Sequence, residues 1–119
     1  MENNGWKRRR DLSPEDKRAA EATADRIRPA LERLRKARNF APAAVLRTFE
    51  DLGLPRDRVS ATPMSTPSWQ TSATPVQGVV YVVRTGTIAC VDGDLRPERV
   101  LVQIEGPDAE GNCIEPVSH

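Results

Sequence analysis

Residue types that commonly build active sites are scarce in this sequence. Its 119 residues include two cysteines and one histidine, which is the final residue, His119. A structural zinc site needs about four Cys or His ligands, more than the chain holds. A histidine at a chain end lacks the fixed geometry of a catalytic base, and no phosphate-binding loop or nucleophile-elbow motif occurs. We therefore expect a non-enzymatic protein with no catalytic residue, no metal site and no cofactor.

Aromatic residues and long apolar runs are also scarce. Only five residues are aromatic, and 38% of the chain is hydrophobic, so the core must depend on Val, Leu, Ile and Ala. No run approaches the roughly 18 apolar residues of a membrane span. No apolar stretch follows the basic run of residues 7–10, as it would in a secretory signal. From these absences we expect one soluble domain with no membrane span and no export signal.

The net charge of +1 conceals an asymmetry between the two halves of the chain. Residues 1–58 contain 15 Lys/Arg and 10 Asp/Glu, whereas residues 59–119 contain 3 and 7. A near-neutral total argues against a dedicated nucleic-acid-binding protein, which usually presents a strongly basic face. Residues 1–12 lack apolar periodicity and predict a disordered basic arm, so residues 13–119 remain for a single domain.

The first half of that domain predicts two helices. Ser13 can cap free N–H groups, and Pro14 suits a first helical position. We expect this helix to reach Arg38 with a kink at residues 25–29, since Pro29 removes a backbone donor. Its apolar stripe has spacings of three and four and consists of Ala20, Ala24, Ile27, Leu31 and Leu34.

The second helix has clear boundary signals. Pro42 again suits the first helical position, and Phe40 can pack on Val45 across the helix start. Gly53 supplies the left-handed residue that ends a helix, and Leu54 can fold back onto it. We expect this helix over residues 42–52.

The second half predicts strands joined by turns. Alternating or continuous β-branched residues favour strands, and Ser, Thr, Pro and Asp-Gly clusters favour loops. We expect strands at 58–64, 79–83, 87–91 and 99–105, a long loop at 65–77, a second loop at 92–98 and a final extended piece at 113–117. The predicted fold class is α+β, with two N-terminal helices packed on one face of a three- to four-stranded, mainly antiparallel sheet.

Cys90 lies in the stretch TIACVDGD and is the one candidate for special chemistry. The carboxylates of Asp92 and Asp94 disfavour a thiolate, so a nucleophile is not expected. Two roles remain, which are a disulfide with Cys113 and a buried free thiol. If the Cys113 segment merely paired beside 99–105, the two cysteines would lie about 10 Å apart, two strands away. We predict the disulfide, which requires the C-terminal segment to return toward the Cys90 strand.

The sequence resembles small actinobacterial domains of unknown function that commonly follow lipoprotein or secretory signal peptides. The resemblance covers residues from about 40 to 119 and implies a fold, a disulfide and export rather than an activity. It is carried by Phe40-Ala41-Pro42, Leu52-Gly53-Leu54-Pro55, Arg58-Val59, Gly78-Val79-Val80, Ala89-Cys90-Val91, Gly93-Asp94, Arg96-Pro97-Glu98-Arg99-Val100, Gly111-Asn112-Cys113 and Glu115-Pro116.

Two functions are consistent with these features. The leading hypothesis is an interaction or structural module of the cell envelope, monomeric or weakly dimeric, that contacts a protein partner. Its expected contact residues are Trp69, Gln103 and Glu105, although Trp69 could instead fold back over the core edge. The alternative is a cytosolic accessory protein that contacts nucleic acid or an acidic protein. Its basic arm and first helix would then supply Arg8, Arg9, Arg10, Lys17 and Arg18.

Overall fold

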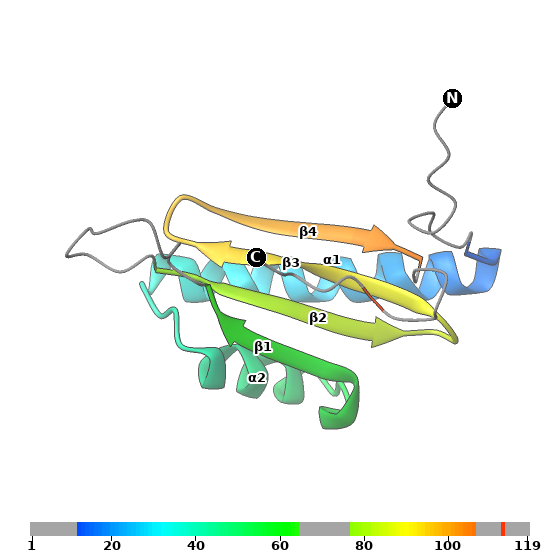
Figure 1. Ribbon diagram of the computed structural model, residues 1–119, viewed down its shortest axis with the longest axis horizontal. Coiled ribbons are helices and arrows are strands. Elements are labelled where there is room, and N and C mark those ends of the chain that lie inside the picture. Colours follow the sequence, from blue (N-terminus) through cyan, green and yellow to red (C-terminus); the bar gives the residue numbers. More distant parts are fainter. Residues whose placement is uncertain (1–11, 65–76, 107–112, 114–119) are drawn as a thin grey trace, which may run out of the picture.

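The computed structural model describes residues 12–64, 77–106 and 113, which form two helices on one face of a four-stranded antiparallel sheet (Figure 1). The helices are α1 (Pro14–Lys36) and α2 (Pro42–Asp51), and a single 3-10 turn, η2 (Arg56–Arg58), follows them. The strands are β1 (Val59–Pro63), β2 (Val79–Thr85), β3 (Ala89–Arg96) and β4 (Arg99–Glu105). They lie in chain order across the sheet, and the predicted fold class is confirmed.

Both helices begin at the predicted residues and end within two residues of the predicted positions. The Ser13 side chain accepts a hydrogen bond from the Asp16 N–H at 3.1 Å, as expected of a helix cap. Helix α1 continues through Pro29 and ends at Lys36, two residues before the predicted Arg38, which has a positive φ of 58°. Gly53, with φ of 86°, follows α2, and the Leu54 N–H donates back to the Phe49 carbonyl at 3.0 Å.

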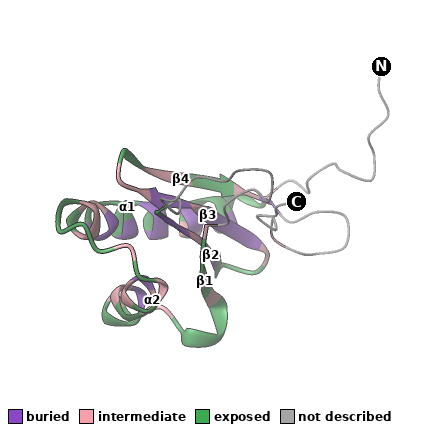
Figure 2. Ribbon diagram, turned by 60° about the vertical axis from the view of Figure 1, so that its left-hand side comes forward, coloured by how far each residue is buried: buried purple, intermediate pink, exposed green. Residues whose placement is uncertain are grey.

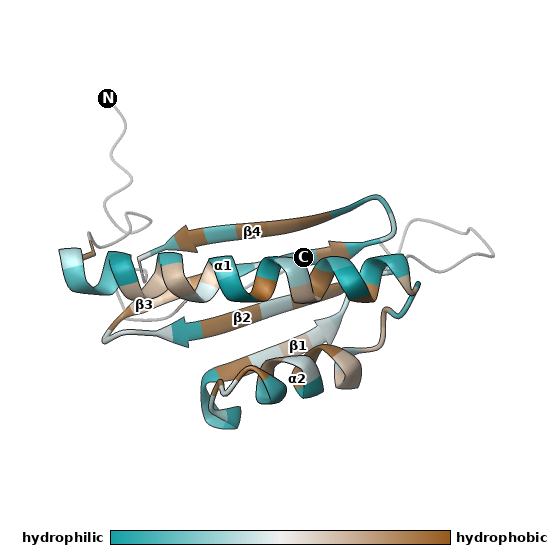
Figure 3. Cartoon of the chain, turned by 180° about the vertical axis from the view of Figure 1, so that it is seen from behind, coloured by the Kyte–Doolittle hydropathy of each residue, from teal (hydrophilic) through white to brown (hydrophobic). Residues whose placement is uncertain are grey.

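The core lies between the sheet and the helices, as the buried ribbon segments in Figure 2 indicate. Helix α1 packs on β3 and β4, and α2 packs on β1. The apolar stripe predicted for α1 is buried except for Leu34, which is half-buried. Figure 3 shows α1 lying across the sheet. Leu12, which the sequence assigns to the arm, also packs against this core. The rings of Phe49 and Tyr81 meet edge to face at 5.7 Å between centroids and join α2 to the sheet.

The predicted loop at 92–98 is wrong, because most of it belongs to β3. Asp92, Gly93 and Asp94 pair with β2 on one side and with β4 on the other. Only Pro97 and Glu98 remain to connect β3 to β4, since Arg96 pairs directly with Arg99. Two neighbouring strands thus hold the Asp-Gly-Asp segment extended, and this tertiary pairing overrides its local preference for a turn.

Gly93 lets three strands approach closely at the centre of the sheet. The buried Tyr81 of β2 stands opposite Gly93, and its hydroxyl donates a 2.7 Å hydrogen bond to the Leu101 carbonyl on β4. A Cβ atom on residue 93 would lie 1.9 Å from that carbonyl oxygen and 3.0 Å from the tyrosine hydroxyl. Burial, with a smaller contribution from the Asp92 and Asp94 carboxylates, raises the pKa of Tyr81, so its hydroxyl stays protonated and able to donate.

Asp16 fastens the start of α1 to the turn between β2 and β3. Its carboxylate accepts the Thr87 N–H at 2.9 Å and the Ile88 N–H at 2.8 Å. These backbone hydrogen bonds to the charged form hold the pKa of Asp16 below its usual 3.8. The side chain therefore satisfies two turn donors that β2 and β3 leave unused.

The Asp16 contact predicts an acid-sensitive component of stability. A carboxyl group whose pKa is lower in the folded state stabilises the fold above its unfolded pKa, and this contribution is lost as the pH falls through the folded value. We expect Asp16→Asn to lower stability at pH 7 and this difference to shrink as the pH falls below about 4 and the wild-type carboxylate becomes protonated. Urea denaturation across pH 2–7 measures the effect. The exposed neighbour gives the control Glu15→Gln, and a destabilisation equal at all pH values would contradict the prediction.

Because residue 93 is crowded, adding a single methyl group there should lower the free energy of unfolding strongly. We expect Gly93→Ala to lower the free energy of unfolding by about 3 kcal/mol, the upper end for overpacking, because β3 and β4 would have to separate. The matched control is Gly53→Ala, where φ is also positive but the nearest atom is 4.0 Å away. This control should cost about 1 kcal/mol from backbone conformation alone. Thermal or urea denaturation measures both losses of unfolding free energy. If the two losses were equal, the close contact with Leu101 would not explain the cost of Gly93→Ala.

Candidate functional site: the outer face of the sheet

The sheet face opposite the helices carries the candidate site. Strand registers place every second residue on this outer face, because side chains alternate across a strand. The face therefore presents Val80, Val82 and Arg84 from β2, Cys90, Asp92, Asp94 and Arg96 from β3, and Arg99, Leu101, Gln103 and Glu105 from β4. No described helix covers it.

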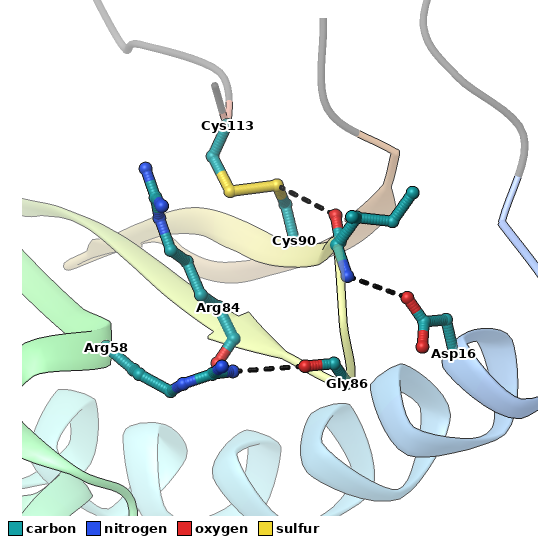
Figure 4. The surroundings of a disulfide bond; sticks show 7 residues. Asp16, Arg58, Arg84, Gly86, Cys90 and Cys113 are labelled. Atoms are coloured by element: carbon teal, nitrogen blue, oxygen red, sulfur yellow. Dashed lines mark hydrogen bonds between the residues drawn. A yellow bond between two sulfur atoms is a disulfide. The ribbon is translucent and has the colours of Figure 1, made fainter. Parts of the chain in front are cut away.

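The disulfide lies at one end of this face. Cys90 and Cys113 are bonded, with their Cα atoms 5.7 Å apart, so the predicted pairing is confirmed. Cys90 is buried and pairs with Glu105 at the last position of the β3–β4 ladder. Cys113 therefore lies beside the start of β3, as the prediction requires. Figure 4 shows the bond above the β2–β3 turn, where Asp16 and Arg58 also attach.

Two arginines line a polar hollow of about 220 Å³ next to this disulfide. Arg58 donates to the carbonyls of Gly86 at 3.2 Å and Arg84 at 3.5 Å, so its guanidinium holds the start of β1 against the β2–β3 turn. The Arg84 side chain lies beside the sulfur atoms (Figure 4). Asp57 contributes an opposite charge to the same hollow. The described residues that line this hollow therefore carry both positive and negative charge. The identified hydrogen bonds of Arg58 connect parts of the fold.

A second hollow, the outer-face hollow, lies at the middle of the sheet and has a different character. Its volume is also about 220 Å³, and its lining is mostly apolar. Its lining includes Val80, Val82, Asp94, Arg96, Leu101 and Gln103. Both valines and Leu101 are only half-buried, so the described residues leave apolar surface in the hollow.

Asp94 is the polar centre of the outer-face hollow. The residue is 7% exposed, and its Oδ2 atom lies 3.3 Å from a nitrogen of Arg99 and 3.4 Å from Nε of Arg96. The contact with Arg96 is an ion pair without hydrogen-bond alignment. Among the described residues, Oδ1 of Asp94 has no hydrogen-bond partner. A buried carboxylate oxygen of this kind favours an incoming N–H donor.

The sequence-predicted contact residues fall in different places. Gln103 lines the outer-face hollow and is exposed, and Glu105 lies two residues further along the same face, half-buried. Lys17 and Arg18 are exposed on α1, on the helix side of the sheet. Trp69, Arg8, Arg9 and Arg10 lie outside the described residues. The structure thus brings Gln103 together with Asp94 and Arg96, which sequence reasoning missed as site residues. Glu105 lies apart from them, opposite Cys90 at the other end of the β3–β4 ladder.

Neither a metal site nor a membrane span is found among the described residues. No group of three His, Cys, Asp or Glu side chains there is arranged to hold a metal ion. Neither α1 nor α2 combines the length and apolar character that crossing a bilayer requires.

We expect the disulfide to contribute measurably to the free energy of unfolding. Closing a ring with a sequence separation of 23 residues corresponds to roughly 3 kcal/mol of unfolded-state entropy. We expect Cys113→Ser to lower the free energy of unfolding by about that amount, since Cys90 then remains in place as a buried thiol. Urea denaturation of the oxidised wild type and the variant measures the loss.

A chemical control separates the bond from packing. The oxidised wild type should gain the mass of two hydrogens on reduction and should offer no alkylatable thiol before it. Two alkylatable cysteines in the native, unreduced protein would contradict the pairing.

A comparison of the chain with known protein families, with characterised proteins and with solved structures found no match. The resemblance to exported actinobacterial domains therefore stays a prediction.

Proposed function

We propose that this protein is a non-enzymatic interaction module of the cell envelope, which binds a segment of a partner protein in the outer-face hollow. The observation that carries the proposal is the combination of a half-buried apolar floor with a carboxylate oxygen of Asp94 that has no hydrogen-bond partner among the described residues. Val80, Val82 and Leu101 would take an apolar side chain of the partner. Asp94 would accept a hydrogen bond from a backbone or side-chain N–H.

The size of the hollow favours a partner side chain over a small molecule. Pockets for cofactors and drug-sized ligands usually measure about 300–1,000 Å³, and this hollow measures about 220 Å³. The exposed amide of Gln103 at its rim supplies both a donor and an acceptor. Such a rim suits the main chain of an extended peptide, whose N–H and C=O groups alternate.

The disulfide supports the assignment to the cell envelope. Disulfides persist in oxidising compartments and are rare where glutathione and thioredoxin keep thiols reduced. Cys90 is fully buried, which limits access of a reducing thiol to its sulfur. The resemblance to exported domains points to the same compartment.

Site-specific photo-crosslinking tests the proposal. A photoreactive residue at position 103 should give a discrete adduct with an envelope protein, and the same residue at the exposed position 21 on α1 should not. Val82→Asp should reduce the adduct at position 103 about tenfold or more, because a carboxylate in the hollow repels Asp94 and removes apolar contact. The control is Ser60→Asp, which adds the same charge to the strand position opposite Val82, outside the hollow.

The alternative function makes an opposite prediction. If the basic arm contacts nucleic acid, the full chain should bind labelled DNA or RNA in a salt-dependent manner, and deletion of residues 1–12 should abolish binding. That result, together with no adduct at position 103, would contradict the proposed function.

A further inference from the structure

Among the described strands, β4 lies at an edge of the sheet and lacks two residue types that commonly protect such edges, proline and lysine. Among the described strands, β1 and β4 form the two edges. Strand β1 has five residues and ends in Pro63, which cannot donate to a neighbouring strand. Strand β4 has seven residues, RVLVQIE, with neither proline nor lysine. An edge of this kind is a template for pairing with another strand.

The helix-facing side of β4 is incompletely covered. Val100, Val102 and Ile104 pair with Leu95, Gly93 and Val91 of β3, which places them on the core side of the sheet. Val100 and Val102 are nevertheless only half-buried, and Ile104 is 38% exposed, although large hydrophobic residues elsewhere in the described chain are better covered. Figure 3 shows this apolar strand at the border of the sheet, beyond α1. A further strand beside β4 would remove this surface from water.

The sequence of β4 is complementary to itself. We propose that two copies of this chain associate along β4, antiparallel about a twofold axis at Val102, and so form a continuous eight-stranded sheet. This register places Arg99, whose guanidinium also contacts Asp94 of its own chain, opposite Glu105 of the second copy. It places Val100 opposite Ile104 of the second copy. Leu101 faces Gln103, and Val102 faces Val102. In an isologous contact both copies use the same surface. The contact therefore forms a closed dimer and does not propagate into a fibre.

Only this register uses the whole strand and pairs its charges. A twofold axis at Leu101 would place Arg99 opposite Gln103, and an axis at Gln103 would place Leu101 opposite Glu105. Axes further toward either end leave fewer than four residues of each strand paired. Opposite charges that lie directly across from each other stabilise a pair of antiparallel strands. The axis at Val102 is therefore favoured.

The proposed dimer does not depend on the proposed function, although it would affect the same face. Leu101 and Gln103 line the outer-face hollow of each copy. Pairing of Leu101 with Gln103 across the axis would place the two hollows side by side on one continuous surface. A partner with two binding segments would then bind both at once.

Sedimentation of the oxidised full chain tests the dimer. We expect a concentration-dependent dimer with a dissociation constant of about 10–100 μM, because an edge-strand pair buries less than the roughly 1,200 Å² of stable interfaces. Glu105→Arg and Arg99→Glu each convert two attractive pairs into two repulsive ones. Each should weaken the homodimer about tenfold or more.

Mixing the two charge variants distinguishes this interface from others. An Arg99→Glu copy facing a Glu105→Arg copy regains opposite charges at both ends, so the mixture should form a heterodimer of near wild-type affinity. Glu98→Arg makes the same charge change in the exposed turn, outside the register, and should leave the dimer unchanged. Ile104→Lys should abolish association without rescue by either variant, and far-ultraviolet circular dichroism confirms that each variant is folded.

Three results would overturn the proposal. The first is a wild-type chain that stays monomeric up to about 1 mM, a concentration at which even weak pairs associate. The second is a dimer that Ile104→Lys leaves intact. The third is a folded mixture of the charge variants that fails to associate more tightly than either variant alone.

Discussion

The structure depends on the placement of two carboxylates, Asp92 and Asp94, in the central part of its sheet. Burying a charged group is costly unless it is paired, and the outer face meets this cost with Arg96 and Arg99, which bracket Asp94 from the same hairpin. On the opposite face of β3 the residue between the two acids is Gly93. Its missing side chain gives Tyr81 the space to cross β3 and bond to β4.

Strand β3 therefore organises two different surfaces. Its helix-facing residues close the core, and its outer residues carry the disulfide and the acidic centre of the outer-face hollow. The ends of the strand are held independently, by Asp16 at the β2–β3 turn and by Arg35, which donates to the Pro97 carbonyl at the β3–β4 turn. Helix α1 thus contacts the strand along its length and at both turns.

The two proposed interactions have a common physical origin. The helices cover one face of the sheet and only part of β4, so apolar surface remains at the outer face and at the edge. The outer-face hollow adds a carboxylate and a rim amide to that surface, which favours a heterologous segment. The edge adds opposite charges at its two ends, which favours a second copy of the chain.

Local sequence signals were sufficient for much of the fold. Ser13, Pro14, Pro42 and Gly53 marked helix boundaries to within two residues, because capping depends on neighbouring backbone groups. The stripe of α1 and the alternation in 99–105 predicted which sides face the core, because these periods follow from helix and strand geometry. In β4 that side is only partly covered. The same signals predicted the α+β class and the residues Gln103 and Glu105 on an open sheet face.

The site itself required the tertiary structure. Residues 89–96 already alternate, with Cys90, Asp92, Asp94 and Arg96 at every second position, yet Asp-Gly is a strong local turn signal and predicted a loop. Only pairing with β2 and β4 on both sides outweighs that preference, and no local pattern reports such long-range contacts. The sequence by itself determined both helices, most of the strand positions and the possible partner of Cys90. The tertiary structure decided that the two acids lie on the outer face of the sheet, because strand pairing sets the face on which a side chain lies.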